Sequence, residues 1–280
     1  MNSRKILFII LLFIVSIFLL VLLTGHITFF NKKSKSYLTN EVISIPISNT
    51  FLPINGSYSF GVGEDTPLNF IYIYSSDKKD FFTKIDSIIL SNENENSISI
   101  ESFEVNGSAK IGKYHVKNLG LNIVGKSEGK TEIREITILT KSGLKKYDVG
   151  ALGINVIKDT SDKPLEVGNS YLIIKGEENN YIYSLQNNSI NKIVINKFDA
   201  ELNGEQVLNI KPFVIDVNKQ KEEEVPIKFD FQKSPYAVTV IRPSIHYSDG
   251  NKQRVLLPPP TWYGLGITEE QIEKTIEYKN

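Results

Sequence analysis

The segment whose residue types come closest to a hydrolase site is Gly125-Lys126-Ser127-Glu128-Gly129. It matches the pattern G-x-S-x-G, in which a sharp turn between a strand and a helix exposes a nucleophilic serine. The residues that follow, 130–140, alternate between apolar and polar and predict a strand where the motif requires a helix. His246, the histidine that follows Ser127 in the chain, lies in another predicted strand. The sequence therefore favours a flexible hairpin loop at 125–129, and a hydrolase is the less favoured alternative.

Candidate metal ligands are few and poorly spaced. His115 and His246 have no H-x-x-H or H-E-x-x-H partner, and the chain contains no cysteine. Three acidic runs offer oxygen ligands but lack the D-x-[DN]-x-[DN]-G spacing of a calcium loop; they are Glu93–Asn96, Glu177–Asn180 and Glu222–Glu224. We expect these runs to be solvated loops. Because no glycine-rich phosphate-binding motif is present either, the sequence predicts no metal and no cofactor.

Two pairs of tyrosines suggest a possible surface for carbohydrate. Tyr72 and Tyr74 are two residues apart, as are Tyr181 and Tyr183, so each pair shares one face of a predicted strand. Exposed rings on such a face would stack against sugar rings. Since one face of each strand must also fill a core, and aromatic side chains do this well, we favour a buried position for all four rings.

The stretch around the single tryptophan is the best candidate for contact with a partner. Pro258-Pro259-Pro260 forces an extended path without backbone donors, and Trp262 and Tyr263 follow it directly. Trp and Tyr are enriched at interaction hot spots because they bury a large area and keep one polar group.

A short C-terminal helix is expected after this stretch. Thr268 and Gln271 have the spacing of a capping box, and Ile272 and Ile276 form a narrow apolar stripe. We expect the stripe to pack back on the second domain rather than on another protein. If the sequence does contain a partner surface, it consists of Trp262, Tyr263, Ile272 and Ile276.

An N-terminal apolar run predicts a membrane anchor. Residues 6–23 contain Ser16 as the one mildly polar residue, and a bilayer core needs about 20 apolar residues in a helix. A cleaved signal peptide is the alternative, but its apolar stretch is usually about 7–15 residues long and ends in an A-x-A-like site that is missing here. We expect residues 1–5 in the cytoplasm, residues 6–28 in the membrane and residues 29–43 as a juxtamembrane linker.

Beyond residue 43 short alternating runs predict an all-β fold. Phe70–Tyr74, Ser97–Glu101 and Glu132–Ile138 each place alternate residues on opposite faces of a strand. Dipeptides that favour tight turns lie between the apolar runs; they are Asn55-Gly56, Asn106-Gly107, Ser142-Gly143, Asn203-Gly204 and Asp249-Gly250. Many short strands joined by such turns indicate antiparallel sandwiches of immunoglobulin-like architecture.

Landmarks recur in the same order in the two halves of the chain. Tyr72-Ile73-Tyr74-Ser75 is repeated as Tyr181-Ile182-Tyr183-Ser184, and Ile133-Arg134 as Ile241-Arg242. The ordered set of matches indicates an internal duplication. We therefore expect two tandem β-sandwich domains, with boundaries as follows: domain 1 at 44–158, a linker at 159–164, domain 2 at 165–260 and a C-terminal tail with the short helix at 261–280.

Charge and composition limit the function further. The chain has 32 basic and 32 acidic residues, and this balance argues against a protein that binds nucleic acid by neutralising phosphates. We predict a single-pass protein of the cell membrane with most of the chain extracytoplasmic. It would act as a non-catalytic binding or scaffolding module of the envelope, with another envelope protein or a wall glycan as its partner. A polysaccharide-binding protein is the first alternative.

Overall fold

A computed structural model describes residues 50–280 except 76–83, 93–96, 142, 159–163, 176–177, 232–233, 235, 265–266 and 280. The segments expected at 1–5, 6–28 and 29–43, and nearly all of the linker expected at 159–164, lie outside the described residues. Within the described part, none of the helical structure is long and apolar enough to cross a membrane.

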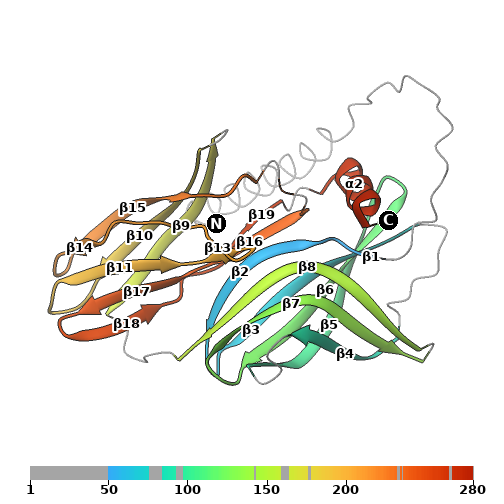
Figure 1. Cartoon of the computed structure of the whole chain (residues 1–280), viewed down its shortest axis with the longest axis horizontal. Coiled ribbons are helices and arrows are strands. Elements are labelled where there is room, and N and C mark those ends of the chain that lie inside the picture. The colour runs from blue at the N-terminus through green and yellow to red at the C-terminus, as the bar shows by residue number, and fades with distance from the viewer. Residues whose placement is uncertain are drawn as a thin grey trace, which may run out of the picture. The chain divides into compact units, whose positions relative to one another are not determined.

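Most of the described residues lie in strands and one short helix lies near the C-terminus, so the all-β prediction is confirmed (Figure 1). In chain order the elements are β1 (Thr50–Phe51), β2 (Ile54–Gly61), β3 (Asp65–Ser75), β4 (Ile85–Asn92), β5 (Ile98–Ile111), β6 (Tyr114–Gly125), β7 (Gly129–Thr140), β8 (Gly143–Ile157), β9 (Leu165–Lys175), β10 (Glu178–Asn187), β11 (Ile193–Asp199), β12 (Glu201–Leu202), β13 (Glu205–Gln206), β14 (Phe213–Ile215), β15 (Gln220–Ile227), β16 (Val238–Arg242), β17 (Ser244–Asp249), β18 (Lys252–Leu256), β19 (Thr261–Tyr263) and the helix α2 (Glu269–Lys279). The runs Phe70–Tyr74 and Glu132–Ile138 lie within β3 and β7, and the run Ser97–Glu101 lies within β5 except for Ser97, which precedes it.

The strands enclose two separate hydrophobic cores. Lobe 1 consists of the sheets β1-β3-β6-β5 and β19-β16-β2-β8-β7-β4, and its core is filled by side chains such as Phe60, Phe70 and Ile136. Lobe 2 consists of the sheets β15-β10-β9 and β14-β11-β17-β18 together with the β12-β13 hairpin, and Phe198 lies in its core. Burial of these alternating apolar residues is the main stabilising contribution in both lobes.

Two strands from the second half of the chain belong to the larger sheet of lobe 1, and the second of them lies in the stretch expected as a C-terminal tail. β16 pairs with β2, and β19 pairs with β16 (Figure 1). Because successive side chains of a strand point to opposite faces, Val238 and Val240 enter the core of lobe 1 while Ile241 enters that of lobe 2. β16 therefore contributes side chains to both cores, and the two lobes share this strand.

The larger sheet of lobe 1 also differs from the purely antiparallel arrangement that the sequence predicts. β2 runs parallel to both of its neighbours, β8 and β16. A strand covered on both faces and paired on both edges is typical of parallel pairing, and all eight residues of β2 are buried.

The dipeptide Asn55-Gly56 is not a turn, contrary to the expectation from its sequence. It lies within β2, between Ile54, whose side chain enters the core of lobe 1, and Ser57, which faces lobe 2. A Cβ atom added to Gly56 would lie 2.4 Å from Leu152 Cδ1 and 2.6 Å from Val240 Cγ1. This position requires glycine because side chains from two neighbouring strands close over it, and not because a turn needs a positive φ angle.

Other turn predictions are confirmed. Asn203 and Gly204 both have positive φ angles, 53° and 78°, and connect β12 with β13 as a two-residue turn. Gly250 follows β17 with a φ angle of 58°.

Asn106-Gly107 does not end a strand as expected. It lies inside the long strand β5, where the register with β6 shifts between Asn106 and Ala109 and the strand bulges.

The two lobes share part of their strand order. β4-β7-β8 of lobe 1 corresponds to β11-β17-β18 of lobe 2, with antiparallel pairing in both. β7 shifts register around Arg134, while the equivalent stretch of lobe 2 breaks between β16 and β17 at Pro243, just after Arg242. Since proline lacks a backbone N–H, this break lets β16 remain with lobe 1 while β17 joins lobe 2.

Arg242, the last residue of the shared strand β16, is held by contacts with Glu64, Pro258 and Tyr58. Its Nη1 lies 2.7 Å from Glu64 Oε1, its Nε donates to the carbonyl oxygen of Pro258 at 2.8 Å, and its guanidinium carbon lies 5.5 Å from the centre of the Tyr58 ring. Glu64 Oε2 in turn accepts the N–H of Gly61 at 2.8 Å. The guanidinium is thus held by a carboxylate, a carbonyl and an aromatic face, which uses the geometry particular to arginine.

The C-terminal helix begins as predicted but packs elsewhere. The N–H of Gln271 donates to Thr268 Oγ1 at 3.3 Å and the N–H of Thr268 donates to Gln271 Oε1 at 2.9 Å, which confirms the capping box. Ile272 and Ile276 are buried, but against Leu52, Ile73 and Tyr114 of lobe 1. The expected packing on the second domain is therefore wrong, because β3 and β6 of lobe 1 present an apolar outer face at this point.

We expect Ile272→Ala to release α2 without unfolding the lobes. Ile272 is fully buried, so its truncation should lower the free energy of docking by about 3 kcal/mol, or roughly two orders of magnitude in hydrogen-exchange protection. Amide exchange of residues 269–277, compared with that of β6, measures this loss. Glu277→Ala on the exposed face is the control and should leave exchange unchanged; equal protection in both variants would contradict the packing described above.

Candidate functional site

The structure divides the predicted partner residues between the two lobes. Trp262 packs at the edge of the core of lobe 1, whereas Tyr263, the next residue of β19, packs on the core of lobe 2 with its ring 4.7 Å from that of Phe231. Thr261 follows the same alternation, and its hydroxyl is hydrogen-bonded to that of Tyr181. Ile272 and Ile276 are covered within the chain and present no surface to a partner. Of the four residues, Trp262 is the one that borders a cavity.

The two groups of the predicted hydrolase are not brought together. Ser127 lies in the turn between β6 and β7, and a strand follows it, as the sequence predicts. His246 lies on β17 of lobe 2, where its Nε2 atom is 3.1 Å from Ser244 Oγ. The serine and the histidine thus belong to different lobes, and the histidine has another hydroxyl as its partner.

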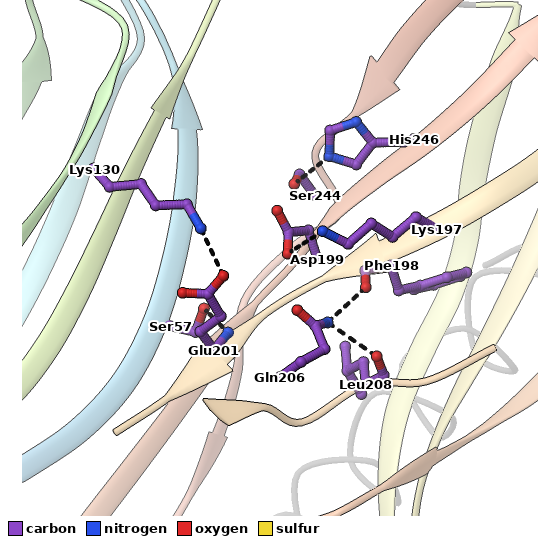
Figure 2. A network of polar contacts seen from close by, with 10 residues as sticks. All are labelled: Ser57, Lys130, Lys197, Phe198, Asp199, Glu201, Gln206, Leu208, Ser244 and His246. Atoms are coloured by element: carbon purple, nitrogen blue, oxygen red, sulfur yellow. Dashed lines mark hydrogen bonds and ion pairs between the residues drawn. The ribbon is translucent and has the colours of Figure 1, made fainter. Parts of the chain in front are cut away.

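A second combination of serine, histidine and aspartate was not apparent from the sequence. Figure 2 shows Ser244, His246 and Asp199 on the neighbouring strands β11 and β17, with Asp199 paired to Lys197 at 2.8 Å. Ser244 is fully buried, so its hydroxyl cannot reach a substrate. Burial lowers the pKa of His246, while the charge of Asp199 opposes this effect and that of Lys197 adds to it. The cluster is a structural contact in the sheet of lobe 2 and not a nucleophile with its base.

Around this cluster, polar contacts join the lobes (Figure 2). Lys130 Nζ of β7 lies 2.6 Å from Glu201 Oε1 of β12, and the N–H of Glu201 donates to Ser57 Oγ of β2 at 3.0 Å. The hydrogen bond that Lys130 donates to the Glu201 carboxylate raises the pKa of Lys130. Gln206 Nε2 donates to the carbonyl oxygens of Phe198 and Leu208, which ties the β12-β13 hairpin to lobe 2. Ser57, Lys130 and Glu201 line a small hollow of about 210 Å³ between β2, β7 and the hairpin.

The residues considered and rejected as metal ligands make contacts within the sheets where the structure describes them. His115 stacks on Tyr74 with ring centres 5.0 Å apart. Glu222–Glu224 lies in strand β15 and not in a loop, with Glu223 3.0 Å from Lys221 and Glu224 accepting from Asn180. Asn179 and Asn180 belong to β10, and Glu93–Asn96 and Glu177 lie outside the described residues. Among the residues that are described, no three acidic or histidine side chains gather in the way a metal ion needs.

The tyrosine pairs do not form a surface for carbohydrate. Tyr72, Tyr181 and Tyr183 are fully buried and Tyr74 nearly so. The rings stack within the cores, with centres 5.9 Å apart in the first pair and 4.2 Å apart in the second. The favoured interpretation, that these rings fill the cores, is confirmed, and binding of sugars through them is excluded.

An open groove of about 650 Å³ lies beside Trp262 on the outer face of the sheet β1-β3-β6-β5. Its walls are formed by apolar side chains, among them Ile71, Val116 and Trp262, and the bulged part of β5 at 106–109 closes it on the far side. α2 covers the neighbouring part of the same sheet face through Ile272. The groove is thus the part of this face that the helix leaves uncovered, and its volume is that of a small-molecule site.

The floor of the groove carries a fixed pair of amides. Asn118 Nδ2 donates to Asn69 Oδ1 at 2.8 Å, and both side chains are half-buried. They stand on the adjacent strands β3 and β6, where Asn69 pairs with Gly120 and Ile71 pairs with Asn118. The sequence could not reveal this pair, because Asn69 and Asn118 are 49 positions apart and only the strand register brings them together.

We expect acidification to destabilise the protein partly through His246. Because its pKa in the folded state is below the ordinary value of 6.5, the unfolded chain takes up a proton first, and the free energy of unfolding falls as the pH drops below that value. His246→Gln should therefore lose less stability between about pH 7.5 and pH 5.5 than the parent protein, as measured by urea denaturation. His115→Gln is the control; an equal loss in both variants would show that His246 does not carry the effect.

Comparisons with known proteins give distant similarities. No protein-family model matches the chain, and no curated protein matches it. Among solved structures, it is similar to the Yersinia pseudotuberculosis adhesin InvE, with 8% identity and a TM-score of 0.19 over 75% of this chain and 58% of that one. It is also similar to the titin domains z1z2 in complex with telethonin, with 9% identity and a TM-score of 0.21 over 76% of this chain and 95% of that one. A third similar structure is DIP-gamma IG1+IG2, with 13% identity and a TM-score of 0.19 over 78% of this chain and 96% of that one. Similarity at this level carries no information on activity, ligand or partner.

Proposed function

We propose that this protein is a non-catalytic binding module of the cell envelope. The apolar run at 6–28 would hold it in the membrane as a single-pass anchor, with residues 1–5 in the cytoplasm and the β lobes outside. The chain contains no cysteine, and over its whole length it carries 32 basic and 32 acidic residues. Recognition would therefore depend on shape and hydrogen bonding more than on electrostatic attraction.

The observation that carries this proposal is the groove beside Trp262. It is the large apolar concavity with convergent amide groups that a binding site requires. Its opposite walls come from the two sheets of lobe 1, and Trp262 is held there because the next residue of β19 is anchored in lobe 2. A site held by strands that serve two cores is well ordered before a ligand arrives, which lowers the entropic cost of binding.

The placement of the chemically reactive residues supports binding over catalysis. Ser127 and His246 are on different lobes, and Ser244 is fully buried beside His246. A hydrolase needs a nucleophile and a base within hydrogen-bond reach of each other and of a substrate. Neither serine satisfies both conditions.

Single cysteines test the proposed topology, because the chain has none of its own. Ile190→Cys places a thiol at a residue that is 91% exposed on lobe 2, and Ser3→Cys places one in the leading tail. On intact cells, a membrane-impermeant maleimide is expected to label the Ile190→Cys variant. It should label the Ser3→Cys variant only after the cells have been permeabilised. The reverse pattern, or recovery of the protein from the soluble fraction, would overturn the anchored arrangement.

Binding itself is tested by co-sedimentation of the purified full-length protein with cell envelopes isolated from a strain that lacks its gene. Saturable retention is the expected result. Retention that does not saturate, or none above that of empty nanodiscs, would overturn the binding function.

A further inference from the structure

The groove beside Trp262 has two chemically distinct surfaces. Trp262, Ile71 and Val116 form an apolar wall, and the amide pair Asn69–Asn118 lies on the floor between them. A ligand that fills the groove must therefore offer apolar and hydrogen-bonding surfaces on the same small unit. A pyranose ring does so, because its C–H face is apolar and its hydroxyl groups lie around the rim.

The amide pair is oriented in advance for hydroxyl groups. Because Asn118 Nδ2 already donates to Asn69 Oδ1, this bond leaves the amide nitrogen of Asn69 as a donor and the amide oxygen of Asn118 as an acceptor for a ligand. Two neighbouring hydroxyls of a sugar can accept from the one and donate to the other.

The groove offers little charge for recognition. Lys117 is the one charged residue among those described along its lining, and its Nζ lies 5.9 Å from the centre of the Tyr74 ring. A second hollow of about 270 Å³ shares Asn69 with the groove and extends over Gly120. Because glycine has no side chain, this part of the sheet face is open beside Glu104. The polar floor thus extends beyond one ring, and a chain of several sugar residues fits it better than a monosaccharide.

Other occupants fit less well. An acyl chain would cover the amide pair without satisfying its remaining donor and acceptor, which is costly for buried polar groups. A peptide strand that binds by main-chain pairing needs an open sheet edge, but the floor here is made of side chains from β3 and β6, which pair with each other along their length.

We propose that the groove binds a neutral oligosaccharide, with one sugar ring packed on Trp262 and its hydroxyls bonded to Asn69 and Asn118. This proposal rests on the proposed binding function and specifies its ligand class. It places the sugar on the outer face of a sheet of lobe 1, whereas Tyr72 and Tyr74 of the same strand β3 lie on the inner face, in the core.

Trp262 reports directly on this site, because it is the single tryptophan of the chain. Full-length protein in nanodiscs, free of glycoside detergents, is titrated with maltotriose, cellotriose and triacetylchitotriose while the tryptophan emission is recorded. At least one trisaccharide is expected to shift or quench the emission with saturation below about 10 mM.

Matched variants separate binding in the groove from effects on the fold. Asn118→Leu removes the amide donor to Asn69 and should weaken the binding by at least about tenfold. Asn196→Leu is the control, because Asn196 makes a similar inter-strand bond, to Ser248 at 2.8 Å, but in lobe 2. It should bind as the parent does, and thermal unfolding of each variant verifies that it is folded.

Several results would overturn the saccharide proposal. These are no response to any of the three sugars, equal weakening in both variants, or a response to decanoate in place of sugars, which would point to an apolar ligand. If Asn118→Leu still sediments with envelopes as the parent does, the binding function stands and the assignment of the groove fails. If the parent protein itself does not sediment, the proposed function fails as well.

Discussion

Replacing Gly56 by valine is expected to prevent folding, and even Gly56→Ala should lower the free energy of unfolding by about 3 kcal/mol. An added Cβ lies 2.4 Å from Leu152 Cδ1 and 2.6 Å from Val240 Cγ1, both in the closed core of lobe 1. The carbonyl oxygen of Val240, at 3.2 Å, limits any sideways shift. Because β16 serves both cores, its displacement would disturb lobe 2 as well. Urea denaturation followed by Trp262 fluorescence measures the loss.

Gly153→Ala is the matched control for this prediction. Gly153 stands on the adjacent strand β8, paired with Ser57, and an added Cβ there would meet the carbonyl oxygen of Gly56 at 3.4 Å, an ordinary contact. Its cost should stay within about 1 kcal/mol. Combining Gly56→Ala with Val240→Ala should recover part of the stability, since the second change removes one clash. Equal stability of Gly56→Ala and Gly153→Ala would contradict the close packing at β2.

Arg242→Met is expected to lower the free energy of unfolding by about 2–3 kcal/mol. Methionine keeps the apolar stem against Tyr58 but removes the ion pair with Glu64 and the hydrogen bond to Pro258. The guanidinium is 11% exposed, so little solvent replaces these contacts, and the 32% exposure of the Glu64 side chain keeps the cost below that of a fully buried pair. Thermal and urea unfolding measure the effect.

A matched arginine tests whether the site, rather than the charge, determines this cost. Arg134 is the counterpart of Arg242 in the sequence repeat, and it pairs with Glu132 at 2.5 Å on an exposed side chain. Arg134→Met should cost no more than about 0.5 kcal/mol. Glu64→Gln in the Arg242→Met background should restore part of the loss by removing the unpaired carboxylate. A similar loss in the free energy of unfolding for the two variants would show that Arg242 does not stabilise the shared strand β16 more than an exposed arginine stabilises its own strand.

Local sequence signals predicted the elements well where the structure depends on near neighbours. The alternation of Phe70–Tyr74 predicted a strand with its aromatic residues inside, and Thr268 with Gln271 predicted the start of α2. Asn203-Gly204 forms the expected turn, because its two positive φ angles need no support from distant residues. In each case the relevant interactions lie within a few residues.

The same signals failed where distant strands decide the structure. Asn55-Gly56 resembles a hairpin turn, but β8 and β16 flank it and hold it within a strand. The sequence predicts β16 in the second domain, because nothing in it shows that β16 pairs with β2. In that pairing Val238 lies opposite Ile54, which is 184 positions earlier in the chain. Parallel pairing between segments so far apart leaves no local pattern.

The candidate groove was partly predictable. Trp262 was identified from its residue type and the prolines before it, and it borders the groove. Asn69 and Asn118 carried no signal, because a polar residue on a strand is ordinarily a solvated one. Their significance depends on strand register, on α2 covering the neighbouring face, and on β19 placing Trp262 beside them.

The central claim, that this face of lobe 1 is the binding surface, is tested most directly by cross-linking in cells. A photoreactive phenylalanine analogue replaces Asn106, exposed on the groove rim, in one full-length variant, and Ile190, 91% exposed on lobe 2, in another. We predict a light-dependent adduct of higher mass from position 106 and none from position 190. An adduct from position 190 with none from position 106 would contradict the account, because recognition would then take place on the other lobe.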